Sequence, residues 1–484
     1  MSSAAPSFPI TPLLPDIRAS LEATPRLVLE APPGAGKTTQ VPLALLAASW
    51  LAGGKIVMLE PRRIAARAAA QFMARQLGEE VGQTVGYRIR FESRVSAATR
   101  IEVVTEGILT RLIQDDPELA GIAAILFDEF HERHLAGDLG AALALDVQAT
   151  LRPELRLVVM SATLDGERIA RWLDAPRITS PGRSFPVRIE HPPARAQESI
   201  EHHLARVAKQ ALAENAGDVL AFLPGRREIA RAQAVLEQLL PSPASETESV
   251  GRDSSRRVSR VGLEPDLHRA GGEGMRIEIV PLHGELSLAD QQHALAPAEP
   301  GTRRIVLATN VAESSVTLPG IRAVIDAGLA REPRFDPNSG FTRLETVAIS
   351  QASADQRAGR AGRVAEGTAY RLWPQSKRLD AARTAEIAQA ELSGLALELA
   401  AWGSAELPWL DAPPPGALAQ ARELLTDLGA LDMDGRISAL GRRMLTLGAT
   451  PRLAAAALRA PDNLRALVAD LLALMEARSP LRGE

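Results

Sequence analysis

The chain has 484 residues, a hydrophobic content of 46% and a net charge of −4, which is enough apolar material for about three globular domains. The near-neutral charge excludes nucleic-acid binding through overall basicity, and the absence of cysteine excludes disulfides, thiolate zinc sites and cysteine nucleophiles. No apolar run approaches the length of about 18 residues that a membrane span needs, and no secretory signal begins the chain, so we expect a cytoplasmic protein without a membrane partner.

Strands and helices are predicted to alternate from residue 26 onwards. Short apolar runs recur at intervals that leave room for a helix between them. Continuous apolar runs of this kind favour parallel strands that are covered on both faces. The predicted strands are 26–29, 55–59, 100–105, 123–127 and 155–160. We therefore expect a first α/β domain over residues 1–182.

A second α/β domain is expected over residues 183–373. Its predicted strands are 187–190, 218–223, 276–280, 303–308, 323–326 and 367–372. Residues 241–274 are rich in Ser, Arg, Glu and Gly and show no periodicity, so we interpret them as a disordered surface insert. The arginines at 252–260 leave a contact with nucleic acid open as the alternative.

The remaining chain is predicted to be helical. Helices at 381–402, 416–428 and 440–447, with a short strand at 436–438, resemble a winged-helix module over residues 374–450. Residues 451–484 read as the start of a helical bundle with a break at 461–463. Since the chain stops without an obvious helix cap, we expect it to be truncated within that bundle.

The turn after the first predicted strand has the pattern of a phosphate-binding loop. N–H groups at a helix N-terminus attract phosphate, and glycines let the backbone wrap it without Cβ clashes. Lys37 is one of only four lysines, and its compact ammonium suits the β- and γ-phosphates, while the Thr38 hydroxyl would hold Mg²⁺. Ala31 replaces the first glycine of the strict pattern, so a chance Gly-rich turn is the alternative. The predicted nucleotide-binding residues are Pro33, Gly34, Ala35, Gly36, Lys37, Thr38 and Thr39.

Two adjacent carboxylates, Asp128 and Glu129, follow the predicted strand 123–127. Near a phosphate-binding loop, such a pair is typical of sites where one carboxylate coordinates Mg²⁺ and the other orients and deprotonates a water. We expect Asp128 to hold the metal, directly or through water, and Glu129 to be the base. An acidic loop without chemistry is the alternative.

Residues 356–363, with the sequence QRAGRAGR, carry three arginines that a helix would place along one side. Buried arginines without neighbouring acids are costly, so they need an anionic partner, and a γ-phosphate fits. We assign Arg360 and Arg363 as arginine fingers, with Gln356 in the same catalytic stretch; a solvated basic helix face is the alternative. Ser161 and Thr163, which end another predicted strand, are weak candidates for relaying hydrogen bonds between domains.

Taken in order, these stretches resemble the motifs of superfamily 2 helicases of the DEAH-box class, and more specifically the bacterial HrpB-type ATP-dependent helicases, over residues 10–480. Residues 31–38 resemble motif I, in which alanine is accepted at the first position. Residues 128–131 resemble motif II but read DEFH where the class has DEAH. We expect Phe130 to lie at the strand surface and to leave both carboxylates in place. Residues 356–363 resemble motif VI.

The resemblance also implies contacts with nucleic acid and coupling residues. Residues resembling motifs Ia, Ib and V are implied to bind the nucleic-acid backbone: Arg62, Arg63, Thr105, Gly107, Thr309 and Asn310. Ser161 and Thr163 resemble motif III and, with His131, are implied to couple hydrolysis to strand movement; a packed histidine is the alternative for His131. Residues 331–349 fall where the class carries a β-hairpin. Leu295 stands where many relatives place a base-stacking aromatic residue, so other nucleoside triphosphates besides ATP are expected to serve.

The resemblance implies two tandem RecA-like parallel-sheet domains followed by a helical winged-helix-like module and the start of a helical bundle. It implies a 3′-to-5′-type helicase or translocase that uses ATP and Mg²⁺ to move along single-stranded nucleic acid, with RNA expected. Phosphate contacts predict binding that is nonspecific in sequence and sensitive to salt. A nucleotide-dependent nucleic-acid-binding protein without unwinding activity stays open as an alternative. A P-loop kinase or transporter ATPase is disfavoured by residues 356–363. Protein partners cannot be inferred from the residues.

Overall fold

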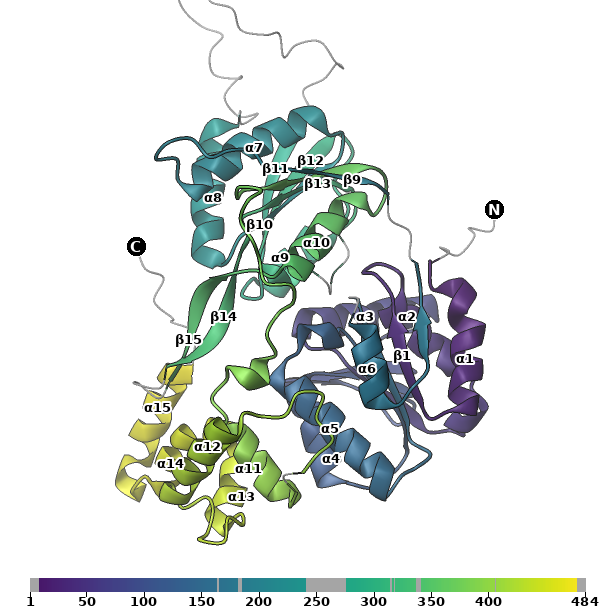
Figure 1. Cartoon of the computed structure of the whole chain (residues 1–484), viewed down its shortest axis with the longest axis vertical. Helices are drawn as coiled ribbons and strands as arrows, with labels where there is room; N and C mark the ends of the chain where they lie inside the picture. The colour runs from purple at the N-terminus through teal and green to yellow at the C-terminus, as the bar shows by residue number, and fades with distance from the viewer. Residues whose placement is uncertain are drawn as a thin grey trace, which may run out of the picture. The chain divides into compact units, whose positions relative to one another are not determined.

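The computed structural model describes residues 8–162, 165–181, 185–240, 276–313, 316, 318–336, 341–404 and 406–476. The insert expected at 241–274, Thr163 and residues 337–340 of the expected hairpin turn lie outside the described residues. The chain divides into two compact units (Figure 1). The first comprises Met1–Pro181, Pro333–Glu345 and Thr384–Glu484, and the second comprises Gly182–Glu332 and Thr346–Arg383.

An eight-stranded sheet with the order β4-β3-β5-β2-β6-β7-β1-β8 forms the centre of the first unit. Its strands are β1 (Arg26–Glu30), β2 (Lys55–Leu59), β3 (Val85–Ile89), β4 (Glu92–Arg94), β5 (Ile101–Val104), β6 (Ile122–Phe127), β7 (Arg156–Ser161) and β8 (Arg177–Thr179). Among these strands, neighbours pair in parallel except in the antiparallel hairpin β3–β4. The five strands predicted here are confirmed with small shifts at their ends. The apolar pattern did not indicate β3, β4 and β8.

Helices cover both faces of this sheet, and each face has its own core. The helices of one face are α1 (Leu14–Ala23), α2 (Lys37–Leu45) and α3 (Arg63–Gln76), and those of the other are α4 (Glu106–Asp115), α5 (Leu135–Thr150) and α6 (Gly166–Leu173). Met58 and Leu126 are buried on the α2 side, whereas Leu59 and Phe127 are buried on the α5 side. Strand residues therefore alternate between the two cores.

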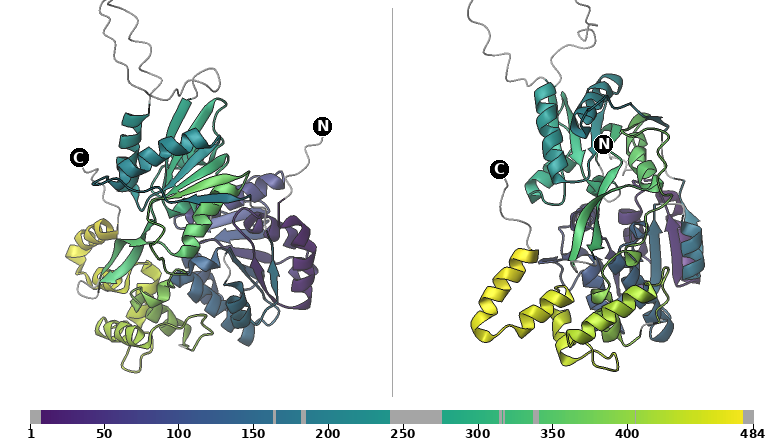
Figure 2. Two further views of the ribbon diagram at one scale, coloured as in Figure 1. Left: turned by 45° about the horizontal axis from the view of Figure 1, so that its top comes forward. Right: turned by 60° about the vertical axis from the view of Figure 1, so that its left-hand side comes forward.

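Four C-terminal helices of the first unit contribute to the core on the α5 side. They are α11 (Ser393–Trp402), α12 (Pro415–Asp427), α13 (Ala439–Leu447) and α14 (Pro451–Arg459). The last described helix, α15 (Arg465–Glu476), follows them in the green-to-yellow part of Figure 2, and its leucines at 467, 471 and 474 are exposed. The helix expected at 381–402 begins only at Ser393. The prediction is wrong for the preceding residues because Glu386, in the short 3-10 turn η7 (Glu386–Ala388), bonds to Arg133 and Leu135. The strand expected at 436–438 is a single bridge between Leu431 and Ile437.

A six-stranded sheet with the order β11-β12-β10-β13-β16-β9 forms the centre of the second unit, and its described neighbours all pair in parallel. The strands are β9 (Val187–Glu190), β10 (Asp218–Phe222), β11 (Arg276–Leu282), β12 (Thr302–Ala308), β13 (Ile321–Asp326) and β16 (Gly367–Arg371). The helices are α7 (Ile200–Glu214), α8 (Arg226–Leu239), α9 (Leu288–Leu295) and α10 (Gln351–Ala358). The expected hairpin is present as β14 (Leu329–Asp336) and β15 (Phe341–Ala348). The predicted fold class, two parallel-sheet units followed by helices, is confirmed.

Candidate active site

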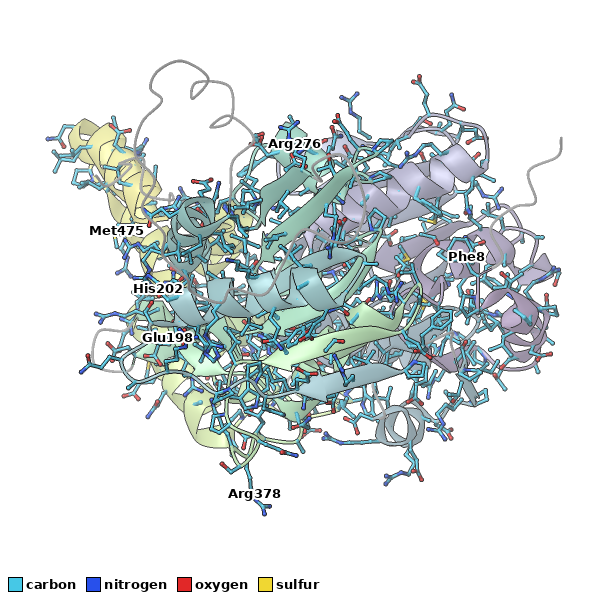
Figure 3. The ribbon with its side chains drawn as sticks, turned by 90° about the horizontal axis from the view of Figure 1, so that it is seen from above. Phe8, Glu198, His202, Arg276, Arg378 and Met475 are labelled. Atoms are coloured by element: carbon cyan, nitrogen blue, oxygen red, sulfur yellow. The ribbon has the colours of Figure 1, made fainter. Side chains whose placement is uncertain are left out.

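The predicted phosphate-binding loop runs from the end of β1 to the start of α2. Gly34 and Gly36 have φ angles of +86° and +94°, which glycine adopts without steric cost. Gly36 also has a close neighbour, because a Cβ added there would come within 2.9 Å of the Cβ of Phe8. Phe8, labelled in Figure 3, packs edge-to-face on Phe72. A larger residue at Gly36 would thus be both strained and obstructed.

Lys37 and Thr38 open α2 and contact the two predicted carboxylates. The Lys37 ammonium donates to Glu129 Oε1 at 2.8 Å and lies 3.8 Å from Asp128 Oδ1. The Thr38 hydroxyl donates to Asp128 Oδ2. Lys37, Asp128 and Glu129 are each only 3% exposed. Because a buried charge must be paired, the phosphate-binding loop and the carboxylates form a single ion cluster.

The two carboxylates of this cluster differ in their electrostatics. Burial raises the pKa of Asp128 to about 6, although the Lys37 charge opposes the shift. Burial would also raise the pKa of Glu129, but the charges of Lys37 and His131 lower it below its ordinary value. The pKa of Lys37 itself is raised, because Glu129 and Asp128 outweigh the effect of burial. Glu129 is therefore ionised at neutral pH, which a general base requires.

The backbone around Glu129 connects the carboxylates to the neighbouring strand. Glu129 has a φ of +50°, uncommon for a residue with a side chain, and its N–H is held by Asp128 Oδ1 at 2.8 Å. His131 Nδ1 lies 3.5 Å from Glu129 Oε2 and accepts the N–H of Ala162 at 3.3 Å. Ser161, at the end of β7, is buried, and its carbonyl accepts the N–H of Ala31 at 3.0 Å. His131 of motif II thus bonds to motif III, and Ser161 of motif III bonds to motif I, while the coupling role of both residues stays a prediction.

Phe130 is buried, so the strand-surface position expected for it is wrong. It begins the 3-10 turn η3 (Phe130–Glu132), meets Phe127 edge-to-face at 6.2 Å and stacks on Trp172 at 5.8 Å with 11° between the rings. Its side chain belongs to the core on the α5 side of the sheet. The carboxylates stay in place because Lys37 and Thr38 hold them from the α2 side.

Four residues predicted to contact nucleic acid lie where β2 and β5 end. These strands are neighbours, so their carboxyl ends meet at one edge of the sheet, next to Asp128 after β6. Arg62 donates to Glu132 Oε1 at 2.8 Å, and Arg63, the first residue of α3, is exposed. Thr105 precedes α4, and Gly107 is exposed in its first turn. The structure therefore places all four at the same sheet edge as Asp128 and Glu129.

Sequence reasoning did not single out two residues near this edge. Glu60, after β2, is a buried carboxyl group beside Asp128 and Glu129. Phe91, at the tip of the β3–β4 hairpin, is 92% exposed, and the Arg90 guanidinium lies 4.9 Å from its ring centre. In the sequence, Phe91 could have been found as an aromatic residue next to an arginine between two short stretches with a strand pattern. The residue type of Glu60 alone does not distinguish it from other acidic residues.

Motif VI lies in the second unit and differs from its expected geometry. The helix α10 ends at Ala358 and continues as the 3-10 turn η6 (Gly359–Gly362), so residues 356–363 do not form one continuous α-helix. Arg357 is fully buried and pairs with Glu313 and Asp326, each at 2.9 Å. The premise that these arginines lack acidic neighbours is therefore wrong for Arg357.

Among the other motif VI residues, Arg360 contacts the segment after β12 that carries Thr309 and Asn310 of motif V. Arg360 is 2% exposed and donates to the carbonyl of Glu313 at 3.0 Å and to that of Val316. Gln356 and Arg363 are half-buried. Thr309 and Asn310 follow β12 directly and are half-buried as well. The roles assigned to these residues stay predictions.

Comparison with known proteins identifies the class of protein to which this fold and site correspond. Residues 16–172 match the family model described as DEAD/DEAH box helicase, residues 255–365 match the helicase conserved C-terminal domain, and residues 421–448 match the winged-helix helicase associated domain (HA2). With two parallel-sheet units and the ion cluster at the phosphate-binding loop, these matches define a DEAD/DEAH-box helicase homologue.

The particular family follows from the relatives. The chain is 44% identical over 483 residues to the protein named ATP-dependent RNA helicase HrpB of Escherichia coli (strain K12), covering 99% of this chain and 55% of that protein. A crystal structure of Escherichia coli DEAH/RHA helicase HrpB matches with a TM-score of 0.86 at 43% identity, over 99% of this chain and 57% of the other. A crystal structure of the E. coli DExH-box NTPase HrpB matches with a TM-score of 0.83 at 43% identity, over 100% and 56%. The chain is a homologue of the HrpB-type helicases, and it spans a little over half the length of these relatives.

Proposed function

We propose that this chain is an ATP-dependent RNA helicase or translocase of the 3′-to-5′ type, which couples ATP hydrolysis to movement along single strands. The observation that carries the proposal is the buried cluster of Lys37, Thr38, Asp128 and Glu129 at a phosphate-binding loop. The name of the Escherichia coli relative, an ATP-dependent RNA helicase, supports RNA as the nucleic acid.

The residues of the cluster fit a magnesium ion. The Thr38 hydroxyl and the Asp128 carboxylate are in contact, and oxygen donors of this kind suit a hard divalent cation. Mg²⁺ bound with the nucleotide would neutralise phosphate charge. Lys37 would exchange its bond to Glu129 for phosphate oxygens, and the released Glu129 carboxylate would then orient the attacking water and accept its proton.

Nucleic acid would bind at the sheet edge formed by the ends of β2 and β5. Arg62, Arg63 and Gly107 stand there with backbone or guanidinium donors suited to phosphate. Arg62 also bonds to Glu132, three residues after the proposed base, so strand binding and hydrolysis would share one hydrogen-bonded segment. Phe91 beside Arg90 adds an exposed ring on which a base can stack.

The remaining assignments are part of the same proposal. Arg360 and Arg363 would act on the γ-phosphate, Thr309 and Asn310 on the nucleic-acid backbone, and nucleoside triphosphates other than ATP would also serve. We propose a cytoplasmic location. No helix within the described part of the chain is long and apolar enough to cross a membrane. A nucleotide-dependent nucleic-acid-binding protein without unwinding activity is the alternative.

The test of the nucleotide site is ATP hydrolysis by Lys37→Ala. Losing the phosphate contact should reduce turnover by a factor of roughly 100 or more. Lys55→Ala is the matched control, because the Lys55 ammonium lies at the start of β2, 3.9 Å from Glu102 and outside the cluster. Retained turnover in Lys37→Ala, or equal loss in the control, would contradict the proposed site.

A further inference from the structure

Glu60 carries a deeply buried carboxyl group beside the proposed nucleotide site. Its residue is 1% exposed, and neither carboxyl oxygen has a hydrogen-bond partner among the described residues. Its backbone N–H donates to Val104 O at 2.9 Å, so the residue is fixed as an extension of the sheet. A buried acceptor without a donor is strongly unfavourable, and native proteins seldom keep one without a reason.

The strand register places Glu60 beside the proposed metal ligand Asp128. Leu59 pairs with Phe127, and the N–H of Asp128 donates to Leu59 O at 3.0 Å, so Glu60 and Asp128 occupy the next position on neighbouring strands. Neighbouring strands lie about 4.8 Å apart. Since Leu59 and Phe127 belong to the core on the α5 side, alternation turns Glu60 and Asp128 to the α2 side, where Lys37 opens the helix.

The charges around Glu60 determine which kind of group can form hydrogen bonds with its carboxyl oxygens. Three carboxylates interact with it, those of Asp128, Glu129 and Glu132, against the cations Arg62 and Lys37. A group that pairs with Glu60 must therefore bring both positive charge and hydrogen-bond donors. A hydrated divalent cation brings both, because Mg²⁺ usually keeps several of its waters in protein sites.

We propose that Glu60 is a positioning residue of the Mg²⁺–nucleotide site, where it accepts hydrogen bonds from the water shell of the ion that Thr38 and Asp128 hold. The inference rests on the proposed function, since it presupposes that the phosphate-binding loop binds a nucleotide with Mg²⁺. It adds a third carboxylate to the pair of motif II, supplied by the strand that leads into residues 61–63. Glu60 would act on the ion only through water.

The test is the Mg²⁺ dependence of ADP binding by Glu60→Gln, measured by calorimetry at increasing Mg²⁺ and also with chelator. Loss of an outer-shell partner typically weakens metal affinity by about 10- to 100-fold, so the Mg²⁺ concentration for half-maximal enhancement of ADP binding should rise by about that factor. ADP affinity in chelator should match the wild type. Glu102→Gln is the matched control, because Glu102 is also buried but lies within the strand β5 and pairs with Arg88 at 2.7 Å. The Mg²⁺ dependence of ADP binding should therefore not change in this variant.

The outcomes separate a role at the ion from a purely structural one. An unchanged Mg²⁺ dependence in Glu60→Gln overturns the inference, and so does an equal loss of ADP binding with and without Mg²⁺. Glu60→Asp keeps the charge on a shorter side chain and should shift the dependence less; it provides the same test if Glu60→Gln does not fold. If the wild type binds ADP without any response to Mg²⁺, the proposed function fails, whereas a normal wild type with an unaffected variant refutes only the role of Glu60.

Discussion

Phe130→Ala would restore the DEAH sequence of the class and would remove a packed ring from the first unit. Truncating a buried phenylalanine costs roughly 3 to 5 kcal/mol. Phe130 is 5% exposed and meets both Phe127 and Trp172, and each aromatic pair adds about 0.5 to 1.5 kcal/mol beyond burial. We therefore expect the free energy of unfolding of the first unit to fall by about 4 to 5 kcal/mol, in the upper half of this range.

Urea denaturation followed by circular dichroism measures this loss. Phe91→Ala is the matched control, since Phe91 is 92% exposed and its loss should cost less than about 1 kcal/mol. Folded Phe130→Ala should still bind ADP, because the bonds from Lys37 and Thr38 hold the carboxylates from the opposite side of the sheet. A loss below about 1 kcal/mol, or one equal to that of the control, would refute the packing argument.

Two further variants test the motif VI assignment and the buried charges. Arg360→Ala should lower ATP hydrolysis by about 10³-fold or more while ADP affinity stays close to the wild type; loss of ADP binding would contradict the arginine-finger assignment. Burial raises the pKa of Glu106 to about 7, although the charge of His134 opposes the shift. The folded state therefore binds this proton more tightly than the unfolded chain does. The resulting contribution to the free energy of unfolding is complete below the ordinary pKa of glutamate, and it decreases by roughly 3 kcal/mol as the pH rises through 7. Glu106→Gln should flatten the dependence of the unfolding free energy on pH between about 4.5 and 7; an unaltered dependence in that variant would count against the reasoning.

The sequence predicts those parts of the site whose residues are consecutive in the chain. The phosphate-binding loop needs a strand, two glycines and a helix start, and these occur in this order from Arg26 to Leu45. Asp128 and Glu129 follow their strand directly, so their position at the sheet edge could be inferred as well. Parallel sheets bring such strand ends together, which explains why the predicted fold and the clustering of Lys37 with both carboxylates agree with the structure.

Features that depend on distant partners could not be inferred in the same way. Phe130 is buried because Trp172 stacks on it from α6, and its own neighbours in sequence are charged or polar. Arg357 has acidic partners that lie 31 and 44 positions away, Asp326 at the end of β13 and Glu313 shortly after β12. Glu60 becomes informative only once the register of β2 and β6 sets it beside Asp128. Helix propensity alone likewise predicted a helix from residue 381, although Glu386 bonds to the backbone of Arg133 and Leu135 and α11 begins only at Ser393.

The most direct test of the central claim is steady-state ATP hydrolysis by the wild type, with no nucleic acid, with single-stranded RNA and with single-stranded DNA of the same sequence. The account predicts that RNA increases the rate above both other conditions, and that Glu129→Gln, which keeps the shape of the proposed base but not its charge, abolishes the increase. A hydrolysis rate that neither RNA nor DNA changes would contradict an RNA-coupled ATPase at this cluster. So would an RNA-dependent increase that is retained in Glu129→Gln.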